Sequence, residues 1–348
     1  MSFLGYIVIS DRVAETCEDC NLEKAPAGVF SFGGIIVTNM KEKPFLTYKQ
    51  QVKKLKDKEL KIEDEEYVIW LLKKYSYFDL ISGYKEPFKR KDGKYKANVT
   101  IEDIYALYCF DDKLRALILR YILKIEKHIK SLISYSFCKK YGEDQGQYMN
   151  VTNFNYTDKM QEEINKLVNK ISHIINHPDN YVYIRYQKEK YGNVPLWVMM
   201  KAITLGTVSK LYSFLQPGIQ SKISREFAYV NEGMLIQMLN LLARVRNVCA
   251  HNERLYDYKY RKGTISDTEI HMGLKIKKEK GQYGKGKNDL FAVVIVFRYL
   301  LEKDNFIDFI KEFEKIFNEL LSRTRMIQKQ QMHKYMGFPD NWVEIKNF

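Results

Sequence analysis

Apolar residues recur at spacings of three and four along most of the chain, which is the periodicity of helices that bury one face. The clearest case is a helix that begins near Gly233 and ends near residue 251. The face that it would bury consists of Leu235, Met238, Leu239, Leu242, Val245 and Cys249. Strand signals are scarce, so we predict an all-α protein of antiparallel helices.

The longest periodic segment extends from Ile101 to Tyr141, and Thr100-Ile-Glu-Asp103 before it matches a capping box. An acidic first turn at residues 62–66 and the apolar residues after it predict one helix that ends at Gly83. Pro217-Gly218 predicts a turn. The other segments predict helices at residues 47–60, 160–175, 197–215, 290–301 and 306–321, a basic insertion at 261–289, and a terminal segment at 336–342 that docks onto the helices.

The helix before residue 251 also has a wholly polar face. It consists of Gln237, Asn240, Arg244, Asn247 and His251. Such a face usually turns to water, but this one ends in a guanidinium, an amide and an imidazole, which together can bind a phosphate and move a proton. At roughly 100° per residue, His251 lies about 20° around the helix from Arg244, 40° from Asn247 and 140° from Arg246.

The composition favours a polyanionic partner. The chain has 348 residues, of which 45% are hydrophobic, enough for a core in one large or two small domains. Its formal net charge of +14 favours nucleic acid before a membrane surface, although a merely basic protein is the other interpretation. The 26 Tyr and 19 Phe residues offer rings for base stacking as well as for the core.

Cysteine usage and hydropathy predict a cytoplasmic protein without a membrane segment. The five cysteines are odd in number and widely spread, which argues against a disulfide framework. The longest apolar run, Leu290 to Phe297, has eight residues and is too short to span a bilayer. We expect no metal site and no cofactor, because the Cys17/Cys20 and His173/His177 pairs each lack further ligands nearby in sequence.

Several short sequences resemble the bacterial abortive-infection proteins of the AbiD/AbiF type, an Abi-like family with the HEPN fold. They are Lys43-Pro-Phe-Leu-Thr-Tyr-Lys-Gln50, Tyr77-Phe-Asp-Leu-Ile-Ser-Gly-Tyr84, Val194-Pro-Leu-Trp-Val-Met-Met200, Leu205-Gly-Thr-Val-Ser-Lys-Leu-Tyr212, Arg246-Asn-Val-Cys-Ala-His251 and Met336-Gly-Phe-Pro-Asp-Asn-Trp342. HEPN ribonucleases carry an Arg, four to six residues and then a His. The resemblance covers roughly residues 41–342.

This resemblance implies a HEPN-like antiparallel helical bundle with additional amino-terminal helices. We expect an extension outside the family at residues 1–39, for which disorder is one interpretation, and a natural start at Met40. An amino-terminal helical region at 40–145 would then pack as one unit with a HEPN-like region at 146–348 that carries the Arg-x4-His motif.

The resemblance also implies a metal-independent endoribonuclease that acts as a phage-defence toxin. RNA cleavage needs a proton acceptor for the 2′-hydroxyl, a donor for the leaving 5′ oxygen and a cation at the phosphate, and it yields a 2′,3′-cyclic phosphate. We assign Arg246, Asn247 and His251 to this chemistry. The helical wheel favours Arg244 as the neighbour of His251, whereas the family pattern favours Arg246; we assign Arg244 to RNA binding. The family context also adds Glu126, for which an ion pair with Lys130 is the alternative.

The remaining expectations concern partners. Basic residues around the first helix and in the insertion, among them Lys53, Lys54, Lys277 and Lys278, are expected to bind RNA. A single motif implies a homodimer with a composite cleft. The alternatives are an RNA-binding HEPN protein that does not cut, a toxin held inactive by a structured noncoding RNA, and a dimeric scaffold whose basic face is incidental.

Overall fold

The computed structural model describes residues 31–32, 35–36 and 44–348. The chain divides into two compact units, Met1–Thr47 and Tyr48–Phe348. In the first, strands β1 (Ser31–Phe32) and β2 (Ile35–Ile36) pair antiparallel. Cys17, Cys20, the expected start at Met40 and most of the expected extension lie outside the described residues.

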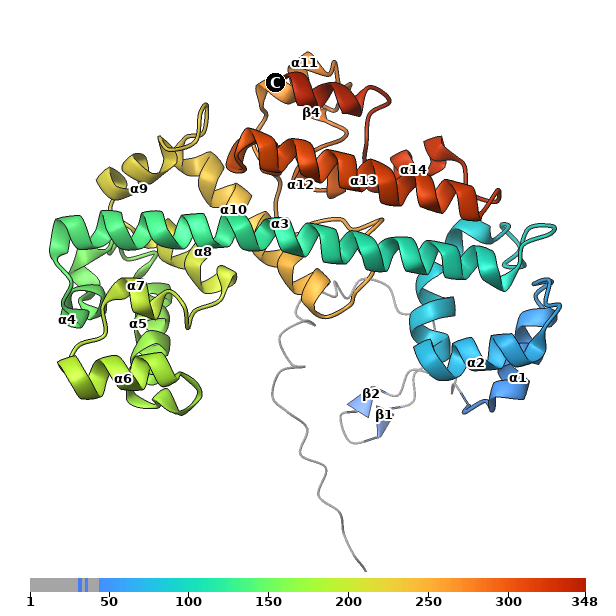
Figure 1. Ribbon diagram of the computed structural model, residues 1–348, viewed down its shortest axis with the longest axis horizontal. Helices are drawn as coiled ribbons and strands as arrows, with labels where there is room; N and C mark the ends of the chain where they lie inside the picture. The colour runs from blue at the N-terminus through green and yellow to red at the C-terminus, as the bar shows by residue number, and fades with distance from the viewer. Residues whose placement is uncertain (1–30, 33–34, 37–43) are drawn as a thin grey trace, which may run out of the picture. The chain divides into compact units, whose positions relative to one another are not determined.

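The second unit is built on the helix α3, Ile101–Tyr141, which has the bounds that the sequence predicted. The capping box is present, because the backbone N–H of Thr100 donates to Asp103 Oδ2 at 2.9 Å. Helix α13 (Lys303–Arg323) runs antiparallel along α3, as Figure 1 shows, and Lys113 pairs with Glu319 across them at 2.6 Å. The long helix is the element around which much of the second unit is arranged.

Two groups of helices gather at the ends of α3 (Figure 1). Near its start lie α1 (Tyr48–Lys56), α2 (Glu65–Tyr75), the π-helix η2 (Ser76–Ser82) and the 3₁₀ turn η3 (Glu86–Phe88). Near its end lie α4 (Gln145–Met149), η4 (Val151–Asn153), α5 (Gln161–Asn176), η5 (Pro178–Asn180), α6 (Val182–Tyr191), α7 (Leu196–Met199), α8 (Leu205–Phe214) and α9 (Pro217–Ser224).

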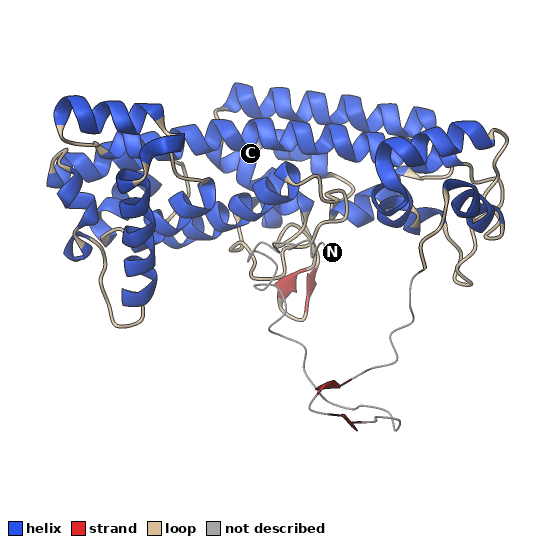
Figure 2. Ribbon diagram, turned by 90° about the horizontal axis from the view of Figure 1, so that it is seen from below, coloured by secondary structure: helices blue, strands red, loops and turns tan. Residues whose placement is uncertain are grey.

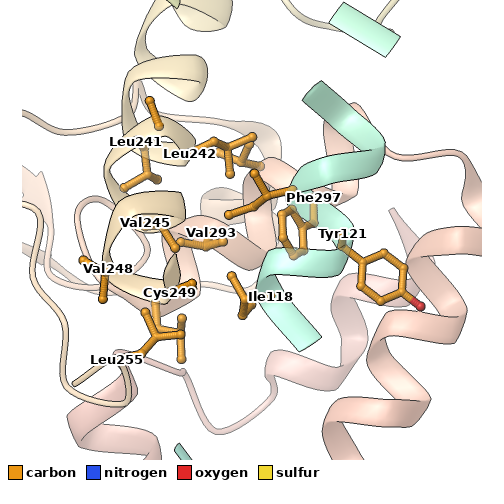
Figure 3. Packing of buried hydrophobic residues seen from close by; sticks show 14 of the residues in the cluster. Ile118, Tyr121, Leu241, Leu242, Val245, Val248, Cys249, Leu255, Val293 and Phe297 are labelled. Atoms are coloured by element: carbon orange, nitrogen blue, oxygen red, sulfur yellow. The ribbon is translucent and has the colours of Figure 1, made fainter. Parts of the chain in front are cut away.

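Helix α10 (Glu232–Ala250) packs against α3, α8 and α12 (Leu290–Leu300). All six residues of its predicted apolar face are buried. Figure 3 shows Val245 and Cys249 of α10 converging with Ile118 of α3 and Val293 of α12. This apolar contact fixes the rotation of α10 and leaves its polar face on the other side.

Three local predictions were wrong. The helix expected to continue to Gly83 ends as an α-helix at Tyr75 and proceeds as the π-helix η2, because Ser76 takes φ 61° and ψ 156°. Pro217 opens α9, where its fixed φ suits a first turn, instead of forming a turn. The helix expected at residues 197–215 is divided into α7, which ends at Met199, and α8, which begins at Leu205, and Trp197 in α7 is half exposed.

The insertion between α10 and α12 contains α11 (Glu269–Gly273) and a hairpin of β3 (Lys278–Glu279) with β4 (Gln282–Tyr283). After α13 follow α14 (Lys329–Met336) and the 3₁₀ segment η6 (Trp342–Asn347). Phe338 and Trp342 pack on Phe313 with centroids 5.3 Å and 5.4 Å away, so the predicted docking of the terminus is confirmed.

Figure 2 shows that helices dominate the described residues and that strands occur as two short hairpins, which confirms the predicted all-α class. Within the described residues, no helix is both long enough and apolar enough to cross a bilayer.

Candidate active site

The polar face of α10 ends at its carboxyl terminus, where the chain turns away sharply. The backbone N–H of His251 donates to Asn247 O at 2.9 Å. Asn252 adopts φ 55°, and the N–H of Glu253 donates back to Val248 O at 3.0 Å. A left-handed residue with such a return bond is a common helix end, and asparagine tolerates it well. His251 is therefore presented at the last turn with its side chain exposed.

The segment after His251 is held to α3 by one buried carboxylate, that of Asp111. Its oxygens accept the backbone N–H groups of Leu255 at 3.0 Å and Tyr256 at 2.7 Å. They also accept the Tyr84 hydroxyl at 2.7 Å and Arg115 Nη1 at 2.7 Å. Asp111 is fully buried, so water does not reach its carboxylate. The four donors satisfy the carboxylate oxygens in place of water.

Arg254 makes a second connection from this segment. Its Nη1 donates to Gly83 O at 2.7 Å, and its Nε donates to Asp257 Oδ1 at 2.7 Å. Gly83 follows η2 directly, so Arg254 links the end of the π-helix to the chain that leaves α10. The two connections place α2, η2 and residues 251–262 around a common opening.

That opening is a cleft with a volume of about 1350 Å³. Its walls come from the end of α2, from η2, from α3 at Tyr108, from the last turns of α10 and from residues 251–262. Of the described residues that line it, three are acidic, namely Asp79, Glu253 and Asp257, and seven are cationic, namely Lys73, Lys74, Arg244, Arg254, Lys259, Arg261 and Lys262. The excess of cations suits a phosphate backbone.

Arg244 and His251 both line this cleft. Both are exposed, and neither side chain makes a hydrogen bond or ion pair in the described part of the chain. Burial raises the pKa of the Tyr258 hydroxyl, and the nearby Arg244 charge opposes that rise. The helical wheel placed Arg244 and His251 on one face, two turns apart, and the cleft lies on that face.

Arg246 and Asn247 are not among the residues that line the cleft. Arg246 is half-buried, and its Nε atom is buried without a hydrogen-bond partner in the described structure. Asn247 is exposed on the surface of α10, and its backbone carbonyl accepts from His251. The catalytic assignment of both residues stays a prediction.

Glu126 lies elsewhere on α3. Its carboxylate is 2.6 Å from Lys130 Nζ, the ion pair that the sequence left as the alternative. Lys130 Nζ also donates to Ile203 O at 2.7 Å. At 1.5 Å per residue, Glu126 is roughly 22 Å along the helix from Asp111, and it does not line the cleft. The structure does not bring Glu126 together with His251 inside this cleft.

The lysines predicted to bind RNA are exposed but also outside the cleft lining. Lys53 and Lys54 lie on α1, with Lys54 Nζ 5.8 Å from the centre of the Tyr77 ring. Lys277 precedes β3, and Lys278 in β3 lies 3.6 Å from Asp267. Their role in RNA binding stays a prediction.

The sequence interpretation overlooked most cations of the cleft. Arg254, Lys259, Arg261 and Lys262 follow the motif within twelve residues, and this cluster is the signal that could have identified them. Lys73 and Lys74 are separated from the motif by about half of the chain, so no local signal links them to it. His173 and His177 lie side by side with ring centres 4.6 Å apart. No group of three or more His, Cys, Asp or Glu side chains in the described ranges is arranged to hold a metal ion.

A family model described as Abi-like protein matches residues 70–257, which is more than half of the chain. The match includes most of α2, all of α3 and α10, and the segment that Asp111 holds. Neither curated proteins nor solved structures gave a match. The chain belongs to the Abi-like protein family, which ties it to abortive infection, a form of phage defence.

Proposed function

We propose that the protein is a phage-defence toxin that cleaves RNA in the cleft beside His251, without a metal ion. One observation carries the proposal: the guanidinium of Arg244 and the imidazole of His251, neither with a hydrogen bond or ion pair among the described residues, line the same strongly cationic cleft. A phosphate bound there would have a cation and a proton-transfer group within reach. Cytoplasmic RNA is the proposed substrate.

The RNA supplies the nucleophile as its own 2′-hydroxyl, so the reaction needs no co-reactant beyond water. The 2′ oxygen attacks the adjacent phosphorus, the bond to the 5′ oxygen of the next nucleotide breaks, and the products are a 2′,3′-cyclic phosphate and a 5′-hydroxyl. The 2′-hydroxyl proton leaves to a base, and the 5′ oxygen gains a proton from an acid. His251 performs one of these transfers. A guanidinium fork stabilises the phosphoryl oxygens throughout.

The arginine can come from the same protomer or from a second one. Within one protomer the geometry supports Arg244, because it lines the cleft with His251. The family pattern assigns Arg246 and Asn247, which lie outside that lining, so we propose that they act only if two protomers meet along α10 in a homodimer.

RNA binding without cleavage is the second candidate. It is favoured by the number of cations in the cleft, which exceeds what one phosphate requires. A structured noncoding RNA that holds the toxin inactive would use the same surface. Cleavage therefore has to be measured separately from binding.

The decisive experiment uses purified protein and end-labelled RNA in excess EDTA. We expect cleavage with a 2′,3′-cyclic phosphate end, and we expect His251→Ala to lose it. His173→Ala is the matched control, because His173 is an exposed histidine outside the cleft. Activity that disappears on chelation and returns with Mg²⁺ would overturn the mechanism. Tight binding without cleavage would support the second candidate.

A further inference from the structure

The cleft wall contains a backbone distortion that needs a reason. Ser76, at the junction of α2 and η2, has φ 61° and ψ 156°, a region that residues with a side chain rarely occupy. The hydroxyl of Ser76 accepts from the N–H of Asp79 at 3.1 Å and donates to Asp79 Oδ2 at 2.9 Å. Seven residues then continue as a π-helix, a geometry that is rare and frequent at functional sites.

The distortion places Phe78 in the cleft. Leu80 and Ile81 of the same segment are completely buried, whereas Phe78 is 78% exposed and lines the opening. An apolar ring that is mostly exposed to water forgoes most of the stabilisation that its burial would give. A strained segment that presents such a ring to a cleft is an arrangement that ligand binding would explain.

Phe78 differs from the other rings of the cleft lining in its exposure, because Tyr84 is buried and Tyr258 and Tyr260 are partly buried against the core. Tyr75 and Tyr108 also line the cleft, but they pack on each other with centres 4.8 Å apart. Tyr75 is further engaged by Lys74, whose Nζ lies 5.0 Å from the ring centre. Phe78 has no aromatic or cationic partner within the described residues, so its faces are available.

We propose that Phe78 is a stacking platform for an unpaired nucleobase of RNA that occupies the cleft. This inference rests on the proposed function and adds the substrate class, which is RNA with an unpaired base beside the cleaved linkage. Aromatic rings next to cations bind single strands because the cations hold the phosphates while the rings stack the bases. A base inside a duplex has its faces covered by its neighbours and cannot stack on Phe78.

The test measures binding in the inactive His251→Ala protein, so that cleavage does not interfere. The probes are a single-stranded RNA with 2-aminopurine at one position and a fully paired RNA of the same sequence. We expect Phe78→Ala to weaken single-strand binding about 5- to 100-fold, the size of a lost base stack, and to abolish 2-aminopurine quenching. Phe78→Trp should retain both. Binding of the paired RNA should change little.

Tyr229→Ala is the matched control, because Tyr229 is also 78% exposed and lies outside the cleft lining. The proposal would be overturned if Phe78→Ala weakened the binding of both RNAs equally. It would also be overturned if Phe78→Ala left single-strand binding unchanged, and an apolar polypeptide would then become the candidate occupant. The result that would contradict the nuclease proposal is a different one from the result that would contradict the stacking proposal. A parent protein that never cleaves, yet needs Phe78 for single-strand binding, leaves the stacking site standing alone.

Discussion

Asp111 Oδ1 accepts a hydrogen bond from the backbone N–H of Tyr256 at 2.7 Å, and this bond joins α3 to the segment that follows His251. The other oxygen accepts from Leu255, Tyr84 and Arg115. The position of the cleft wall therefore depends on one buried carboxylate, whose charge Arg115 balances at 2.7 Å.

Asp111→Ala should lower the free energy of unfolding by about 3–5 kcal/mol, because it removes the buried carboxylate that balances the Arg115 charge and leaves two buried backbone N–H groups without an acceptor. Asp112→Ala is the control. Asp112 also pairs with Arg115, at 3.0 Å, but its side chain is 60% exposed, so its loss should cost less than about 1 kcal/mol. Urea unfolding of both variants measures the difference. Equal destabilisation would show that Asp111 does not anchor the segment.

The sequence predicts elements well where a local pattern determines them. The bounds of α3 follow from its capping box and long periodicity, and the apolar face of α10 follows from its three-and-four spacing. Asp111 could not be identified in this way. With Arg115 four residues later it has the spacing of a surface ion pair, and only the return of the chain at Leu255 buries it.

The candidate site shows the same limit. The helical wheel places Arg244 beside His251, and the structure brings both into one cleft. The break at Ser76 has no comparable signal, because Tyr77, Leu80 and Ile81 continue a pattern that fits an uninterrupted α-helix. Consequently the exposure of Phe78, and the contribution of α2 to the cleft, emerge only when the chain is folded.

RNA binding should depend steeply on salt. Each phosphate contact that is lost should reduce the slope of log affinity against log salt by about 0.7 for a single strand. We expect Arg261→Ala combined with Lys262→Ala to reduce it, because both residues line the cleft. From the sequence we also expect the double alanine variants at Lys53/Lys54 and at Lys277/Lys278 to reduce the salt slope.

The control for these pairs is Lys139→Ala combined with Lys140→Ala, which removes two exposed charges near the far end of α3. Its slope should match that of the parent. If all four double variants change the slope equally, RNA binding depends on net charge alone and the cleft has no special role.

Stability should fall in mild acid because of His271, which is fully buried. Its Nε2 lies 3.0 Å from Gly286 O, and its Nδ1 faces the N–H of Thr268 at 3.1 Å, as suits a neutral ring with its proton on Nε2. Burial lowers the pKa of His271 below its ordinary value of about 6.5. The folded state therefore has its full stability above about pH 6.5, the ordinary pKa of the unfolded histidine. It loses stability as pH falls below that value and through the lower pKa of His271 in the folded state.

Urea midpoints at pH 7.5 and pH 5.5 test this expectation. His271→Gln should reduce the difference between the two midpoints. Part of the difference should persist in His271→Gln, because burial also lowers the pKa of His333. A His271→Gln protein with the full difference would contradict the assignment.

The last prediction separates a cleft within one protomer from a composite site. His251→Ala should lower RNA cleavage about 10²–10⁴-fold, the usual contribution of a proton-transfer group. The fold should persist, because the His251 side chain is exposed and does not lie on the buried face of the helix. If Arg244 holds the phosphate, Arg244→Ala should lower RNA cleavage by a comparable factor. Arg244→Lys should restore little of that activity, since an ammonium lacks the planar fork. The same series at Arg246 tests the family assignment.

Mixing inactive variants then identifies the protomer that supplies the arginine. If Arg246 acts on the His251 of its partner, a heterodimer of His251→Ala and Arg246→Ala chains contains one intact site, and mixing restores cleavage. If Arg244 and His251 act within one protomer, a heterodimer of His251→Ala and Arg244→Ala chains has a defect in both sites and stays inactive. Labelled RNA and subunit exchange in mild urea suffice for the measurement. Restoration only in the Arg246 mixture would establish the composite site, whereas an active Arg246→Ala protein would leave Arg244 as the catalytic arginine.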